Sequence, residues 1–336
     1  MKSRVTVLML VGVLVAGATY WARAGATTGG GSHARTFQFR YLATVTQIPR
    51  EARTARIWVP LASSRENQRV LGRAIHSPYP YEVAEEPAFG NEVAYLQLTA
   101  PLPESVSIDV AYDVAVEGIQ RLSPGTPPVP PSDRERELAL RDESLLVVND
   151  GIKRLAMEAT MGQTTELARA RALYDYVIQK MAYDKAAPGW GKGDTMRACL
   201  LGKGNCTDFH SLFISMSRSI GIPSRFVIGA PVPEGPVGAI PGYHCWAEFY
   251  HPDYGWVPVD ASEAWKHPER KDYYFGSADP NRMLISVGRN IELVPKQDGP
   301  PVNIFVYPYV EIDGRPGATV ETRFEYADRN GKEARG

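Results

Sequence analysis

The chain has 336 residues, of which 44% are hydrophobic and 22% charged, and its formal net charge is -1. This composition is typical of a globular protein with a sizeable core, and it argues against a disordered, fibrous or multi-span membrane chain. A near-neutral charge gives no support for nucleic-acid binding, which requires a basic surface. Three cysteines are too few for a disulfide framework, and their odd number leaves at least one thiol unpaired within the chain.

The first 24 residues have the pattern of an export signal. Lys2 and Arg4 precede an uncharged apolar run over residues 5–18, and residues 22–24 have the small-x-small pattern that a signal peptidase reads. With its flanking residues the run approaches the roughly 20 residues that span a bilayer, so an uncleaved membrane anchor is the alternative. Both interpretations predict an exported chain, periplasmic or secreted, with a membrane tether only if residues 1–24 are retained.

A flexible tether and a β-rich domain follow this segment. Residues 25–34 are rich in Gly, Thr and Ser, which predicts the tether. Between Phe37 and Val45, large apolar residues recur at every second position, the period of a half-buried strand. Three further segments have a similar pattern and are separated by Pro and Gly: 55–59, 93–98 and 106–114. We therefore expect a β-rich domain over residues 35–121, which could contact another envelope protein or a glycan.

A Pro-rich linker over residues 122–133 separates this domain from a helical pattern. Ser132 is a predicted helix cap, and we expect the first helix to run to about Val147. Second and third helices are predicted from about Ile152 and Thr165. These helices begin the predicted catalytic domain, which covers residues 134–295.

The C-terminal part returns to strand patterns. Residues 304–312 and 319–326 alternate, and Asp313-Gly314 between them has turn chemistry. We expect these two segments to form a hairpin within a C-terminal β region over residues 300–328.

A glycine-led segment places Cys206 at the start of a further helix. Gly202-Lys203-Gly204 precedes the thiol, and an apolar stripe at helical spacing follows it: Phe209, Leu212, Phe213, Met216 and Ile220. Unpaired N–H groups and the positive dipole end at a helix N-terminus favour a thiolate and can hold a developing oxyanion. The alternative is a small buried apolar side chain, which is common for a free cysteine.

Two aromatic-rich strands on either side of Pro252 predict a hairpin that carries a histidine and an aspartate. If the strands pair symmetrically about Pro252, His244 stands opposite Asp260 on the same face, close enough for an imidazole–carboxylate hydrogen bond. A slip of one residue would send the two side chains to opposite faces. The alternative is a structural pair that only holds the strands together.

Taken together, a thiol at a helix start and a His and an Asp on a later hairpin have the composition of a nucleophilic triad. In such a triad the imidazole takes the thiol proton and later protonates the leaving group, while the carboxylate orients the imidazole.

Four blocks in this region resemble the transglutaminase-like superfamily of papain-like thiol enzymes: residues 204–213, 218–226, 244–249 and 255–260. The resemblance implies an α+β fold with a papain-like core, an N-terminal all-β module and C-terminal β-strands. It also implies that Cys206 is the nucleophile, His244 the general base and acid, and Asp260 the residue that orients the imidazole. The flanking strands look like those of exported bacterial members.

Two departures from the family pattern concern the other cysteines. Cys245 follows the histidine where the family usually has a hydrophobic or small residue, and we expect it to be a buried thiol. A disulfide between Cys199 and Cys206 would silence the nucleophile, whereas one between Cys199 and Cys245 would leave it free; the sequence does not decide between them.

An oxyanion site needs a second donor, and Trp190 and Asn205 are the candidates. The four side chains Cys206, His210, His244 and Cys245 lack the spacing of a zinc site, so we expect no metal and no organic cofactor. Arg282 and Arg289 could line a substrate cleft, but we favour solvated or structural roles for them.

The resemblance implies acyl transfer at a peptide or protein amide. Water as the acceptor would make the chain a peptidase or amidase, which we favour because a short bacterial chain without calcium loops differs from animal crosslinkers. A lysine amine as the acceptor would make it a protein-crosslinking transglutaminase. A binding module that keeps the fold without catalysis is the alternative from another class.

Overall fold

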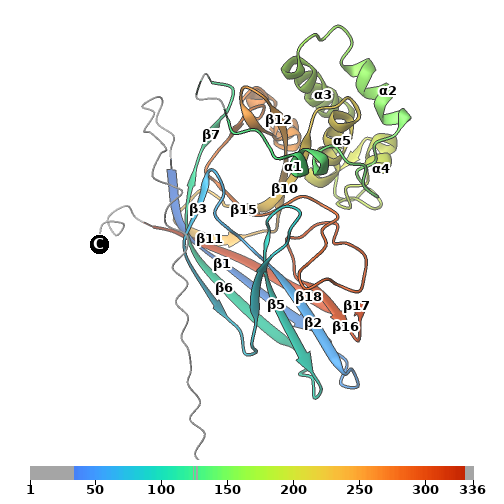
Figure 1. Ribbon diagram of the computed structural model, residues 1–336. Coiled ribbons are helices and arrows are strands. Elements are labelled where there is room, and N and C mark those ends of the chain that lie inside the picture. Colours follow the sequence, from blue (N-terminus) through green and yellow to red (C-terminus); the bar gives the residue numbers. More distant parts are fainter. Residues whose placement is uncertain (1–33, 124, 126–127, 330–336) are drawn as a thin grey trace, which may run out of the picture. The chain divides into compact units, whose positions relative to one another are not determined.

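The computed structural model describes residues 34–123, 125 and 128–329 (Figure 1). The predicted export signal or anchor of residues 1–24, and the tether apart from Ala34, therefore lie outside the described residues. Within the described ranges, the helices are too short or too polar for any of them to span a bilayer.

The predicted strands of the β-rich region are confirmed. They are β1 (Ala34–Thr46), β2 (Thr54–Leu61), β5 (Glu92–Thr99) and β6 (Val106–Glu117), to which the structure adds β3 (Gln68–His76) and β4 (Glu82–Glu85). The alternating side chains of β1 from Phe37 to Val45 are buried, as their period predicts. They belong to one hydrophobic cluster with the inward side chains of β2, so two sheets share a core.

The predicted C-terminal hairpin is wrong. Strand β16 (Tyr309–Ile312) turns at Asp313-Gly314 into the short β17 (Arg315–Pro316), and β16 also pairs with β2. Strand β18 (Thr319–Asp328) instead lies in the other sheet, where it pairs along β1 from Thr46 to Phe37. The turn closes a two-residue loop because Asp313 and Gly314 both have positive φ, and the long ladder with β1 then captures the rest of the chain.

Two five-stranded antiparallel sheets result, in the orders β11-β18-β1-β6-β3 and β17-β16-β2-β5-β4. Strand β11 (Val237–Ile240) reaches the first sheet from the loop that precedes His244. The segment before the histidine is therefore anchored to the β-rich region.

The helices gather around α5, as Figure 1 shows. They are α1 (Asp133–Leu138), α2 (Asp150–Ala159), α3 (Glu166–Lys180), α4 (Thr195–Leu201), α5 (Cys206–Ser219) and α6 (Ala261–Lys266), followed by the 3-10 turn Pro268–Arg270. Caps at Asn149 and Thr165 confirm the predicted starts of α2 and α3, and every side chain of α5 is buried.

The first predicted helix is too long. Ser132 caps α1 through a capping box with Glu135, but the helix ends at Leu138 and does not reach Val147. The next carbonyls have other donors, because Ala139 accepts from Ser224 N–H and Arg141 from the buried Arg218 guanidinium. Tertiary hydrogen bonds therefore replace the helical ones.

A four-stranded antiparallel sheet lies against α5, in the order β13-β12-β10-β15. Its strands are β10 (Ser224–Pro231), β12 (His244–His251), β13 (Gly255–Val259) and β15 (Arg282–Val287). The remaining strands are two-residue pairs: β7 (Ile119–Gln120) with β14 (Ser277–Ala278), and β8 (Ala182–Tyr183) with β9 (Lys203–Gly204). The chain therefore has the predicted α+β architecture.

The edge strand β15 is covered by side chains from the β-rich region. The Gln68 amide donates to Leu284 O at 2.9 Å and accepts from Leu284 N at 2.7 Å. Asn91 makes the same pair of contacts with Val287, both at 2.8 Å. These amides satisfy backbone groups that an edge strand leaves open, and they fix β15 in place.

Candidate active site

Cys206 is the first residue of α5, and the residues around it hold the helix start in place. Asn205 caps the helix, and its side-chain oxygen accepts from Thr207 N–H at 3.0 Å. Its amide group donates to the Tyr243 hydroxyl at 2.9 Å. Cys206 follows this cap directly, so its thiol lies at the helix N-terminus, where the positive end of the dipole favours a thiolate.

Asp208 organises the chain on both sides of the thiol. Its buried carboxylate accepts the N–H groups of Gly191 at 2.8 Å, Gly193 at 3.1 Å and Asn205 at 3.0 Å. A Cβ atom at Gly204 would collide with the Asp208 side chain, so only glycine fits there. Asp208 therefore ties the loop of Gly191 and Gly193 to the start of α5.

His244 and Asp260 are in direct contact, with Nε2 of the imidazole 2.6 Å from Oδ2 of the carboxylate. Cys206, His244 and Asp260 are 2%, 7% and 2% exposed. The structure thus brings His244 and Asp260 into contact, and Cys206 lies close enough to His244 for each to shift the pKa of the other.

The predicted strand register is nevertheless wrong. The ladder pairs His251 with Gly255 and ends at Ala247 with Val259, so Asp260 lies beyond it as the cap of α6. The three-residue turn is centred on Asp253 instead of Pro252, and Gly255 takes positive φ where β13 begins. This shift changes the pairing partner of each residue by two positions, so His244 and Asp260 still lie on the same face. Their side chains therefore meet diagonally and not directly across the strands.

The Asp260 carboxylate has fixed donors on both oxygens. Oδ1 accepts the Ser262 hydroxyl and the Glu263 N–H, each at 3.0 Å. Oδ2, which contacts His244, also accepts Nη1 of Arg282 at 3.1 Å. Arg282 is therefore a buried partner of this carboxylate, and no motif around it in the sequence indicated that role.

The electrostatics favour an ion pair between the thiol and the imidazole. Hydrogen bonds from Cys245 and His244 hold the pKa of Cys206 well below its usual range, although burial acts in the opposite direction. Burial would lower the pKa of His244, but the charge and hydrogen bond of Asp260, together with Cys206, raise it to about 10. A thiolate and an imidazolium are thus the favoured states near neutral pH.

His210 and Cys245 form a second buried layer beneath this pair. His210 Nε2 accepts the Ala261 N–H at 3.1 Å, and its Nδ1 lies 3.8 Å from the Cys245 sulfur. Nε2 also lies 3.5 Å from Asp260 Oδ1. Cys245 also lies 3.7 Å from the Thr207 hydroxyl.

All three cysteines are free thiols, so neither disulfide considered from the sequence forms. Cys245 is buried, as predicted, and lies close enough to Cys206 that each thiol shifts the pKa of the other. Cys199 is half-buried on α4.

Aromatic rings surround the thiol. Tyr243 lies edge-on to Tyr307, with centroids 6.0 Å apart, and Tyr307 stacks on Phe324 of β18. On the other side Tyr183 stacks on Trp265. Burial, and next the charge of Cys206, raise the pKa of Tyr183, Tyr243 and Tyr307, so all three hydroxyls lie within electrostatic reach of the sulfur.

The two oxyanion candidates differ in their surroundings. Asn205 is adjacent to the thiol, but Thr207 and Tyr243 already engage its side chain. Trp190 is 39% exposed, and its ring faces the Lys185 ammonium. The described part of the structure records no hydrogen bond for its indole. A role for either residue at an oxyanion stays a prediction.

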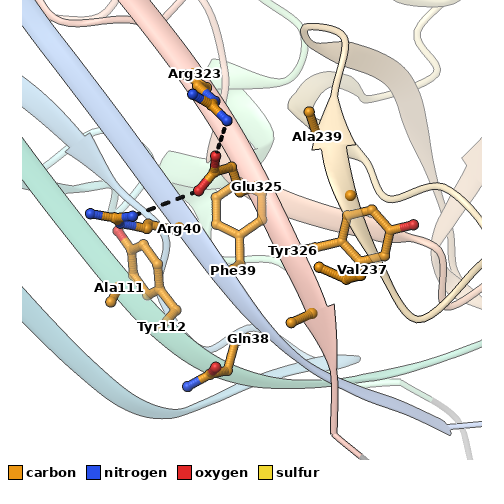
Figure 2. A pocket seen from close by; sticks show the side chains of 12 residues that line it. Gln38, Phe39, Arg40, Ala111, Tyr112, Val237, Ala239, Arg323, Glu325 and Tyr326 are labelled. Atoms are coloured by element: carbon orange, nitrogen blue, oxygen red, sulfur yellow. Dashed lines mark ion pairs between the residues drawn. The ribbon is translucent and has the colours of Figure 1, made fainter.

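A pocket of about 460 Å³ lies away from this cluster, on the sheet that contains β1 and β18. Figure 2 shows Arg40 and Arg323 on either side of Glu325, with Val237 and Ala239 of β11 beside Tyr326. It shares no lining residue with the thiol cluster. Within the ranges the structure describes, no group of three or more His, Cys, Asp or Glu side chains is arranged to hold a metal ion.

Comparison with known proteins gives one family, one curated relative and several solved structures. Residues 153–261 match the sequence model of the transglutaminase-like superfamily. A Haemophilus influenzae protein, described only as uncharacterized, is 30% identical over 204 residues, which are 51% of this chain. The chain spans about half the length, 55%, of that curated relative.

Two solved structures match this chain over most of its length. The "Putative Cysteine Protease" from Cytophaga hutchinsonii has a TM-score of 0.61 at 17% identity, over 89% of this chain and 92% of that one. The periplasmic domain of TgpA from Pseudomonas aeruginosa has a TM-score of 0.36 at 18% identity, over 73% and 98%. At these identities the first likeness concerns the fold alone.

Proposed function

We propose that this chain, which contains a transglutaminase-like core, is an exported cysteine enzyme that transfers an acyl group from a peptide or protein amide through a thioester on Cys206. The observation that carries the proposal is the 2.6 Å contact between His244 and Asp260 beside a buried thiol at a helix start. A binding module would need none of these ionisable groups to be buried together, since each carries a desolvation cost.

Acylation begins with the thiolate. The Cys206 sulfur attacks the carbonyl carbon of the amide, and the carbonyl oxygen gains negative charge that the Cys206 N–H faces. The His244 imidazolium then gives its proton to the leaving nitrogen, the C–N bond breaks, and a thioester remains. Asp260 stabilises the imidazolium and keeps Nε2 turned toward itself.

Deacylation regenerates the thiolate. Neutral His244 takes a proton from the acceptor, which attacks the thioester carbon, and the C–S bond breaks. We favour water as the acceptor, which gives a carboxylic acid and makes the chain a peptidase or amidase. A hydrolytic reaction is also what the printed description of the Cytophaga hutchinsonii structure, "Putative Cysteine Protease", names for that protein.

The proposal includes a location and partners. The pattern of residues 1–24 supports a periplasmic or secreted chain, with a membrane tether if that segment is retained. A contact between the β-rich region and an envelope protein or glycan is part of the same proposal.

Alkylation of Cys206 against pH tests the chemistry directly. We would use a Cys199→Ser background, because Cys199 is the more exposed of the other two thiols, and follow Cys206 by peptide mapping. The expected result is rapid alkylation well below pH 8 that slows markedly in His244→Ala. An ordinary thiol profile that is identical in both variants would reject the enzyme in favour of the binding module.

The acceptor is tested separately. Ammonia release from glutaminyl peptides, with and without a primary amine, reports the first half of the reaction. Under our proposal ammonia appears with glutamate and no amine is incorporated. Incorporation of the amine would instead identify a crosslinking transglutaminase, with the same steps up to the thioester.

A further inference from the structure

We propose that Arg282 is a positioning residue of this site, which holds the Asp260 carboxylate in the orientation that serves His244. The inference rests on the proposed function but concerns a residue that the family match does not include. The match ends at residue 261, whereas Arg282 opens strand β15.

The first support is the geometry at one oxygen atom. Oδ2 of Asp260 accepts from His244 Nε2 at 2.6 Å and from Arg282 Nη1 at 3.1 Å. Ser262 and Glu263 donate to the other oxygen, Oδ1. With donors on both oxygens, the carboxylate cannot rotate without losing a hydrogen bond. Removing Arg282 leaves the oxygen that faces His244 without its second anchor.

The second support is that Arg282 is itself held. It is 8% exposed, its Nη2 lies 3.7 Å from Asp279, and its guanidinium carbon lies 5.2 Å from the centre of the Trp246 ring. Trp246 also stacks against the His244 ring, with centroids 6.3 Å apart. One indole thus packs against both the arginine and the imidazole that share Asp260.

Strand β15 gives this arrangement a rigid support. Its backbone pairs with β10 on one side and with the Gln68 and Asn91 side chains on the other. The β-rich region therefore fixes the strand from which Arg282 reaches the site. That is a physical reason for the two regions to occur in one chain.

The third support is the charge balance around Asp260. The groups that act on Asp260 electrostatically, or on which it acts, come from several elements: His210 on α5, His244 and Cys245 on β12, Tyr174 on α3, Tyr274 and Arg282. Asp279 and Glu263 act in turn on Arg282, and Cys206 acts on His244. Among these described groups, Arg282 is the one whose positive charge does not depend on pH in the working range. Without it, the pKa of the buried Asp260 rises, and the imidazolium loses its partner at acid pH.

The test compares Arg282→Met with a matched control, Arg225→Met, in the Cys199→Ser background. Arg225 also stacks on a tryptophan, 4.0 Å from the Trp256 ring centre, and pairs with a carboxylate, Glu248 at 2.7 Å, but it touches none of the three site residues. The rate of Cys206 alkylation rises with pH as the thiol loses its proton, and we call this rise the acid limb. We expect the midpoint of the acid limb to move up by about one pH unit in Arg282→Met but not in Arg225→Met. At a pH below the midpoint, such a shift lowers the alkylation rate about tenfold. Arg282→Lys, which keeps the charge, should recover most of the shift.

The Arg282→Met variant leaves the Asp260 carboxylate buried without its arginine, which could unfold the protein. A double-mutant cycle that combines Arg282→Met with Asp260→Asn therefore completes the test. The Asp260→Asn background carries a neutral amide that needs no counter-charge, and there Arg282→Met should leave the alkylation profile unchanged. A further shift in that background, or profiles of folded Arg282→Met and Arg225→Met that coincide with the parent, would overturn the inference.

Failure of the proposed function would be recognised separately. An ordinary thiol profile in the parent rejects the enzyme, while the proton resonance of His244 Nε2–H still reports on Asp260. A downfield resonance that persists in the parent and in Arg225→Met but is lost in Arg282→Met supports the positioning role even then. A resonance that is the same in all three variants rejects it.

Discussion

The Nε2 atom of His244 lies 2.6 Å from Oδ2 of Asp260, which leaves Nδ1 as the ring nitrogen available to Cys206. The contact fixes the tautomer, because the carboxylate accepts only from a protonated Nε2. The same imidazole can then take a proton from the thiol at Nδ1 without rotating. A short contact between two buried residues thus defines which atom of the base faces the nucleophile.

The opposite pKa shifts of the thiol and the imidazole predict a broad pH plateau for acylation. The rate should rise through a low pKa as Cys206 loses its proton, because only the thiolate attacks. It should fall again near pH 10, where His244 loses the proton that the leaving nitrogen needs. Single-turnover thioester formation between pH 4 and 11 measures both limbs. A rate that rises only near the pKa of an ordinary thiol, about 8.5, would contradict the ion pair.

Gly204→Ala, in the short strand β9 just before Cys206, should disturb the loop that holds the helix start and lower the stability of the protein. The new Cβ would collide with the Asp208 carboxylate, which holds the N–H groups of Gly191 and Gly193. Loss of such buried hydrogen bonds costs about 1–3 kcal/mol, so the free energy of unfolding should fall by at least that much in urea titrations. Gly317→Ala is the control, since its Cβ would meet only ordinary contacts. Equal stabilities of the two variants would show that Asp208 moves aside without cost.

The sequence identified the parts of the site that depend on local pattern. The glycine-led helix start located Cys206. His244 and Asp260 lie an even number of positions apart along the hairpin, which placed them on one face. It could not give the strand register, because the turn is centred one residue later than Pro252, which moves the pairing by two positions and still preserves that face.

The features that the sequence missed depend on long-range contacts. Arg282 reaches Asp260 from a strand 22 residues later in the chain, with no motif around it. The predicted C-terminal hairpin failed because β18 finds a longer partner in β1, at the other end of the chain. The first helix ended early because Arg218 and Ser224 compete for its carbonyls. No local pattern encodes such partners.

Cys245→Ala should raise the pKa of Cys206 without abolishing alkylation. The Cys245 hydrogen bond is the largest contribution that lowers that pKa, so its removal should move the acid limb of the alkylation profile upward, by about one pH unit. The His244–Asp260 contact remains, and the plateau rate should be kept. Cys199→Ala serves as the control, because Cys199 is absent from the groups that shift Cys206. An alkylation profile that neither substitution changes would show that Cys245 does not lower the pKa of Cys206.

Tyr243→Phe should loosen the helix start beneath the nucleophile. The lost hydroxyl accepts from the Asn205 amide at 2.9 Å and lies 3.2 Å from the Thr207 hydroxyl. We expect stability to fall by about 1 kcal/mol and the melting temperature by about 2 °C, the usual effect of one hydrogen bond in a chain of this size. Tyr174→Phe removes a comparable bond to Lys271 O at 2.8 Å, away from the thiol. Both variants should lose similar stability, but only Tyr243→Phe should move the Cys206 alkylation profile upward, by a few tenths of a pH unit, because its helix cap is less well fixed. An unchanged profile in Tyr243→Phe would mean that Asn205 holds the helix start without help from the tyrosine.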